Sequence, residues 1–275
     1  MSRLGHLLRI EVIKARKRPA LWITLGVFAF FTVAAVMPSL MRAMQGGGPG
    51  PPFALPWIWR AVLQPPINMG PFFIGVAMIL LFAPEFGWKT ARQNVIDGLA
   101  KEHFFFGKVI AFVFLVAAFF IVPIIAGVAA SVISPEPTGT FARTPELNHM
   151  SGYGLALALW GSVGFLLAAT IRAAGGAMGI MLLYFLVENM LVSLVSLWNA
   201  ALETYLDYLP TQLFDTMTRN EFYYPDELAR VNASRAQIGQ PPLDYPDFGV
   251  VAVAVLAWVA LFLGVAFVST RKRDL

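Results

Sequence analysis

The segment ALWITLGVFAFFTVAAVMPSLM, residues 20–41, decides the fold, because it runs for 22 residues without a charged side chain. A bilayer core of roughly 30 Å is crossed by about 20 apolar residues in a helix. A secretory signal would have a shorter apolar core followed by a small-residue cleavage site. We therefore expect this segment to be a retained first membrane-spanning helix.

The rest of the chain has the same character. Of its 275 residues, 58% are hydrophobic and 13% are charged, a balance that soluble domains rarely show. We expect an all-α membrane protein, residues 1–275 forming one domain with six transmembrane helices. Because Pro71 and Pro84 limit the second apolar segment, a shallow or re-entrant element is the alternative there. The five further segments of spanning length are residues 67–84, 109–133, 152–171, 177–198 and 248–269.

Lysines and arginines predict the orientation, since cytoplasmic flanks carry an excess of them. If both termini are cytoplasmic, the inside segments hold 14 of the 20 basic residues, every lysine included. The outside segments then hold six arginines against ten carboxylates. We expect a multi-pass protein of a bacterial inner (cytoplasmic) membrane with both termini in the cytoplasm.

The segments outside the spans also carry signals. Residues 1–19 place leucines at helical spacing among basic residues, which predicts an interfacial amphipathic helix, although a simple topogenic signal fits too. In the outer loop 42–66, LPWIWR (residues 55–60) is typical of an aromatic anchor at the headgroup level. The extracytoplasmic segment 199–247, between the fifth and sixth helices, begins with an amphipathic stretch and predicts a short helix or helical hairpin.

The cytoplasmic loop PEFGWKTARQNVIDGLAKEHFFFGKVIAF, residues 84–112, is the most informative segment for function. Residues 90–102 have a helix-compatible composition, with Val95, Ile96 and Leu99 on one side. A short helix with an apolar edge and mixed charge suits docking into a groove of another protein. An amphipathic helix resting on lipid fits the same residues.

This loop resembles that of ABC-2 type permeases, the membrane-spanning subunits of ATP-binding cassette transporters. The resemblance rests on the order of Glu85, a glycine, Thr90, Arg92 and then GLAKEHFFFGK, residues 98–108. The basic N-terminal helix, the six spans, the large segment before the last span and the basic tail TRKRDL are similar to the layout of that family as well.

The resemblance implies a function and its partners. The chain would export or extract a substrate across the membrane, using ATP hydrolysed by a separate ABC ATPase subunit and working with a second permease copy or a paralogue among membrane lipids. Residues 85–108 would be the coupling loop, with Gly107 and Lys108 opening the third helix. The residues assigned to contact with the ATPase are Asn94, Val95, Ile96, Asp97, Gly98, Leu99, Ala100, Lys101, Glu102 and His103.

Catalytic chemistry of its own is not expected of this chain. It has no GxxxxGK[ST] loop to hold phosphates, no cysteine, and only the scattered His6, His103 and His149. We therefore nominate no catalytic, cofactor-binding or metal-binding residue, and we expect no nucleic acid partner. ATP and Mg²⁺ would be bound by the partner ATPase.

Two features within the predicted spans remain open to more than one interpretation. Glu188, followed by Asn189, lies at membrane depth, where a charge costs about 2.5–3.5 kcal/mol. Glu188 is either a polar point on the translocation path or at a permease interface, or a structural hydrogen-bonding group; a secondary transporter using it as a midplane site is the alternative function. Glycines such as Gly164 and Gly179 predict close helix packing, within the protein or at a dimer seam.

Overall fold

The computed structural model describes residues 13–14, 16–46, 53–87, 93, 100–135, 139–198 and 203–272. Within these ranges there is no strand, and six helices are long and apolar enough to cross a membrane. Each contains one of the predicted segments, so the prediction of an all-α membrane protein with six spans is confirmed. The six are α2 (Pro19–Met44), α3 (Ile58–Gly87), α5 (Lys101–Ile133), α6 (Thr144–Ile171), α7 (Ala174–Trp198) and α12 (Phe248–Lys272).

The second span is longer than its apolar stretch suggests. α3 is one continuous 30-residue helix that accommodates four prolines, so the re-entrant alternative is wrong. It begins within LPWIWR, the motif that was predicted to lie at the headgroup level, and one of the two tryptophans of this motif does not face lipid. Trp59 is fully buried, and its indole nitrogen donates to the carbonyl oxygen of Phe141 over 2.7 Å. The second half of the motif, residues 58–60, begins a core helix.

α3 and α6 form the centre of the bundle and are the most buried of the spans. They approach closely where Gly75 and Gly164 face each other. A Cβ placed on Gly164 would lie 2.5 Å from the carbonyl oxygen of Gly75. Small residues allow such backbone contact, which in lipid replaces the hydrophobic effect as a source of packing energy. This glycine therefore serves packing within the chain.

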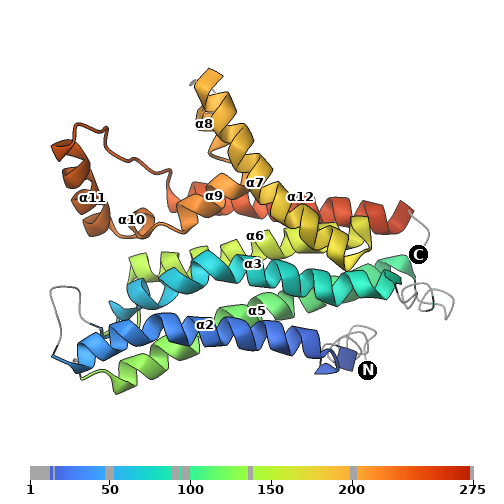
Figure 1. Ribbon diagram of the computed structural model, residues 1–275, viewed down its shortest axis with the longest axis horizontal. Helices are drawn as coiled ribbons and strands as arrows, with labels where there is room; N and C mark the ends of the chain where they lie inside the picture. Colours follow the sequence, from blue (N-terminus) through green and yellow to red (C-terminus); the bar gives the residue numbers. More distant parts are fainter. Residues whose placement is uncertain are drawn as a thin grey trace.

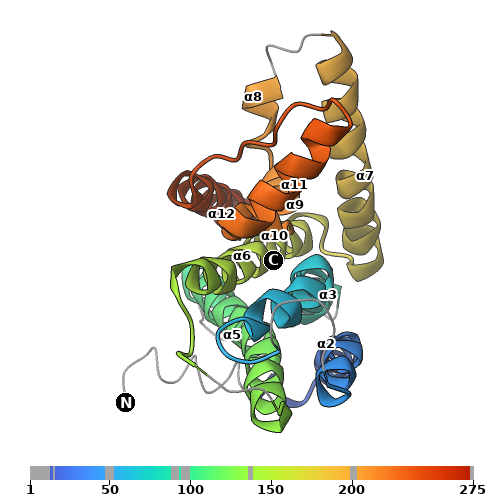
Figure 2. The ribbon, with the colours of Figure 1, turned by 90° about the vertical axis from the view of Figure 1, so that its left-hand side faces the viewer.

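The two ends of the bundle differ in charge. α2 begins and α12 ends on the same side of the molecule (Figure 1), as an even number of spans requires. The described lysines all lie at this end, which we call the basic end. α7 starts at the basic end and then diverges from the other spans, and it lies at the edge of the molecule when viewed along the bundle (Figure 2).

The chain between α7 and α12 contains four short helices, in agreement with the helical segment that was predicted, and residues 238–247 then lead to α12 without regular structure. The four helices are α8 (Glu203–Leu206), α9 (Pro210–Met217), α10 (Asn220–Tyr223) and α11 (Pro225–Gln237). Arg60 at the start of α3 fastens α11, because its guanidinium donates to both carboxylate oxygens of Asp226, over 2.6 and 2.9 Å. These hydrogen bonds lower the pKa of Asp226. The interfacial helix predicted over residues 1–19 lies mostly outside the described residues.

Candidate functional site

The predicted coupling segment lies at the basic end, between α3 and α5. Residues 94–99 of it are outside the described residues. Ala100 precedes α5, and Lys101, Glu102 and His103 form its first turn. The prediction that Gly107 and Lys108 open this helix is wrong: α5 begins at Lys101, with Glu102 in the first turn, where an acidic side chain favours a helix start.

The end of the chain meets the start of α5. Arg271 of α12 lies 3.5 Å from the carboxylate of Glu102, and Lys101 donates to the carbonyl oxygen of Arg271 over 3.4 Å. These side chains are exposed or half-buried, so the contact contributes little stability by itself. It nevertheless shows that the basic C-terminal turn adjoins the segment assigned to coupling.

A buried charge cluster lies beside the coupling segment. Glu85, in the last turn of α3, and Lys108, in α5, are both fully buried, and Lys108 Nζ lies 2.6 Å from Glu85 Oε1. Arg18 donates to the same oxygen over 3.0 Å, and Lys14 Nζ lies 3.6 Å from it. One carboxylate thus holds cations from α5 and from the start of the chain. Breaking such a buried pair costs about 3–5 kcal/mol, because it leaves an uncompensated charge.

The two flanks of the coupling segment are therefore joined to each other. Glu85 precedes the segment and Lys108 follows it, and their ion pair closes the base of the loop. Both residues belong to the loop motif that resembles ABC-2 permeases, but the motif did not indicate that they form a pair. The structure brings them together, and it adds Arg18, which no motif had indicated.

Glu188 lies in α7 and is buried against α9. Its carboxylate oxygen Oε1 accepts a hydrogen bond from the backbone N–H of Thr211 over 2.8 Å and another from the Thr211 hydroxyl. Thr211 is in the first turn of α9, where backbone N–H groups have no helical partner and an anion is favoured. The neighbouring Asn189 accepts from the side chain of Gln212 over 3.1 Å. The Glu188 and Asn189 side chains thus both bind the first turn of α9.

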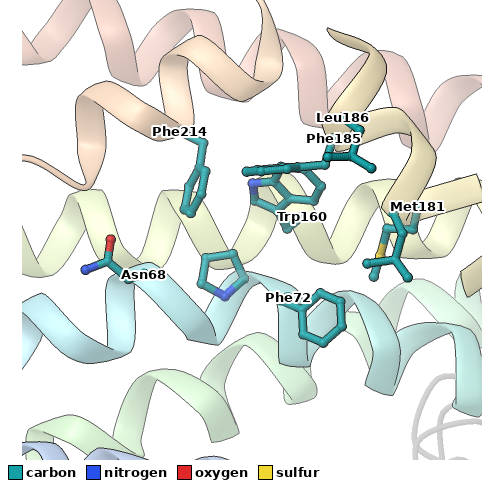
Figure 3. Close-up of a pocket in the computed structure, with 9 residues that line it drawn as sticks. Asn68, Phe72, Trp160, Met181, Phe185, Leu186 and Phe214 are labelled. Atoms are coloured by element: carbon teal, nitrogen blue, oxygen red, sulfur yellow. The ribbon is translucent and has the colours of Figure 1, made fainter. Parts of the chain in front are cut away.

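An apolar pocket opens between α3, α6, α7 and α9 (Figure 3). Its volume is about 410 Å³. The indole nitrogen of Trp160 is buried and has no hydrogen-bonding partner among the described residues. Such a lining can hold an apolar group, with Asn68 as a polar contact. The lining residues are Asn68, Pro71, Phe72, Trp160, Met181, Leu182, Phe185, Leu186 and Phe214.

A family model described as ABC-2 family transporter protein matches residues 7–189, which is more than half of the chain. The chain belongs to the ABC-2 transporter family. No curated protein matches it. In this ABC-2 transporter the matched range contains α2, α3, α5 and α6, and it ends at Asn189 in α7. It therefore includes the charge cluster, the whole coupling segment and Glu188, whereas α8–α12 follow it.

Substitutions at Glu188 distinguish a requirement for its negative charge from a structural hydrogen-bonding role in this ABC-2 family member. Glu188→Gln keeps an acceptor oxygen for Thr211 and should leave the folded yield in detergent nearly unchanged. Glu188→Leu leaves the buried Thr211 donors without an acceptor, which costs about 1–3 kcal/mol, and should lower the melting temperature and the yield. If Glu188→Gln is as harmful as Glu188→Leu, the negative charge itself is required and the hydrogen-bonding role is insufficient.

Proposed function

We propose that this protein is the membrane-spanning subunit of an ABC transporter that exports or extracts a substrate, using ATP hydrolysed by a separate nucleotide-binding subunit. The observation that carries the proposal is the loop of residues 84–112, which resembles the coupling loop of ABC-2 permeases and whose flanks are joined by the Glu85–Lys108 ion pair. A rigid base of this kind suits a loop that receives force from another subunit. A second copy or a paralogue would complete the translocation path.

In the proposed arrangement the basic end faces the cytoplasm of a bacterial cell. Lysines and arginines are retained preferentially on that side during insertion, and the described lysines all lie at this end. The connection between α3 and α5, which contains the predicted coupling segment, is then on the side of the membrane where a cytoplasmic ATPase is present. The secondary-transporter alternative receives less support, because Glu188 is already engaged by Thr211 and its burial leaves it little room to bind an ion.

The direct test is purification of the tagged chain in mild detergent from its native membranes. We expect an ABC ATPase to co-purify, identified by mass spectrometry, with two permease subunits per complex counted by native mass. A preparation that contains the permease and no ATPase, under conditions in which other ABC complexes remain intact, would contradict the proposal.

Within that complex, Ile96→Asp and Leu99→Asp should each reduce the co-purified ATPase. A charge placed in the centre of an interface typically costs 2 kcal/mol or more, which is about 30-fold in Kd. Ile238→Asp is the matched control, because Ile238 is exposed beyond α11, away from the basic end. Full retention of the ATPase by both coupling-segment variants would move the contact to another part of the chain.

A further inference from the structure

Arg18 precedes α2 and reaches the backbone of α3. Its guanidinium donates to the carbonyl oxygen of Leu80 over 3.2 Å and to that of Leu81. Leu80 is four residues before Pro84, and an ordinary residue at 84 would donate its N–H to the Leu80 carbonyl. Because proline has no N–H, that carbonyl loses its helical donor. Arg18 supplies a donor at this position.

The same proline weakens α3 at this point, since one hydrogen bond of the helix is missing there. Beyond it, α3 continues only to Gly87, and the coupling segment follows. Arg18 binds on both sides of the proline: Leu80 and Leu81 before it, and Glu85 after it over 3.0 Å. The Arg18 side chain therefore bridges the two sides of Pro84.

Glu85 carries this connection onward to α5. It is fully buried together with Lys108, and the two charges cannot separate without leaving a buried charge uncompensated. The last turn of α3 and the first turns of α5, which flank the coupling segment, therefore form one unit. Arg18, at the N-terminal end of α2, connects the start of that helix to the unit, and Lys14 lies 3.6 Å from the same Glu85 oxygen.

We propose that Arg18 is a positioning residue that ties α2 to the last turn of α3, so that α2 follows when the coupling segment is displaced. The displacement rests on the proposed function, because it requires an ATPase that moves the segment. The contact of Arg18 with the last turns of α3 does not depend on that function, because it is formed within this chain. The two statements are tested separately.

The tie is tested on the purified full chain. The protein has no cysteine, so spin labels on Lys17→Cys and Gly87→Cys report the distance between the start of α2 and the end of α3. Both positions are exposed, and a Cβ at Gly87 meets nothing within 4 Å. We expect a single narrow distance distribution, and we expect Arg18→Met to broaden it. Arg16→Met is the matched control, because Arg16 is an exposed neighbour.

Whether α2 follows a displacement of the coupling segment is tested on the complex with its ATPase. The nucleotide-free complex is compared with the complex trapped by ADP and vanadate. A label at Ile238→Cys, which is exposed beyond α11 and away from the basic end, serves as the reference. We expect the Lys17–Ile238 and Gly87–Ile238 distances to change together on trapping. In Arg18→Met only the Gly87–Ile238 distance should change, while the ATPase stays bound, since Glu85 and Lys108 remain paired.

The outcomes separate the two ideas. A distribution that stays narrow in Arg18→Met, or a trapped Arg18→Met complex in which α2 still follows α3, overturns the role of Arg18. A wild-type chain that retains no ATPase overturns the proposed function, while the first experiment still decides the role of Arg18. If Arg18→Met is not monodisperse, Arg18→Lys, which keeps the charge but reaches fewer acceptors, should broaden the Lys17–Gly87 distribution to a smaller extent.

Discussion

The Gly164→Val substitution should remove most of the folded protein. A Cβ at this position would lie 2.5 Å from the carbonyl oxygen of Gly75 and 2.9 Å from its Cα. Both neighbours are backbone atoms of a core helix, so no side-chain rotation can relieve the overlap. Overpacking a core costs about 1–3 kcal/mol when side chains can adjust, and we expect at least the upper value here. Size-exclusion chromatography in detergent measures the loss.

Gly179→Val is the control for this substitution. Gly179 lies in α7, and a Cβ there would meet nothing within 4 Å. The folded yield of the single chain should therefore be unchanged. Equal yields of the two variants would mean that α3 and α6 are not in backbone contact, and the centre of the fold would have to be revised.

The number and place of the spans could be predicted from the sequence. An apolar run as long as residues 20–41 is seldom anything other than a membrane-spanning helix. The helix ends could not be predicted. α3, α5 and α6 each begin several residues before their apolar runs, since a helix can extend beyond the hydrocarbon wherever packing continues. The burial of Trp59 could not be predicted either, because a single sequence does not distinguish a tryptophan at the membrane interface from one in the protein core.

The charge cluster was only partly predictable. Glu85 and Lys108 were found as parts of a loop motif, and Pro84 within a span implies a carbonyl in need of a donor. The donor, Arg18, is more than 60 residues away in the chain and was one of several basic residues near the N-terminus. Pattern and spacing cannot select among them, since the choice depends on how α2 packs against α3.

The hydrogen-bonding partner of Glu188 could not be predicted from the sequence. Its depth in a span predicted a polar partner, because an isolated carboxylate in hydrocarbon is costly. The partner is the first turn of α9, whose backbone N–H groups are present in any sequence. A short helix that places its N-terminus against a span leaves little sign in composition. The sequence therefore indicated that Glu188 needs a partner but not which one.

Trp59→Ala should have an effect as large as that of Gly164→Val, although an interfacial anchor would tolerate it. The Trp59 ring is fully buried and packs against Gly127 of α5, where an added Cβ would lie 2.5 Å from a ring carbon. Removing a buried tryptophan side chain costs about 3–5 kcal/mol. Trp59→Phe, which keeps a ring but loses the bond to Phe141 and the part of the indole that packs against Gly127, should cost less than Trp59→Ala. Melting temperatures in detergent measure both.

A double-mutant cycle makes this prediction specific to the contact between Trp59 and Gly127. Gly127→Ala alone should destabilise the protein, because the rigid indole ring occupies the space of the new methyl group. In a Trp59→Ala background the same substitution should be neutral or stabilising, because it fills part of the cavity left by the ring. The two effects would then fail to add, with a coupling free energy of about 1–3 kcal/mol. Additive effects would place Trp59 away from α5, as the headgroup-anchor interpretation requires.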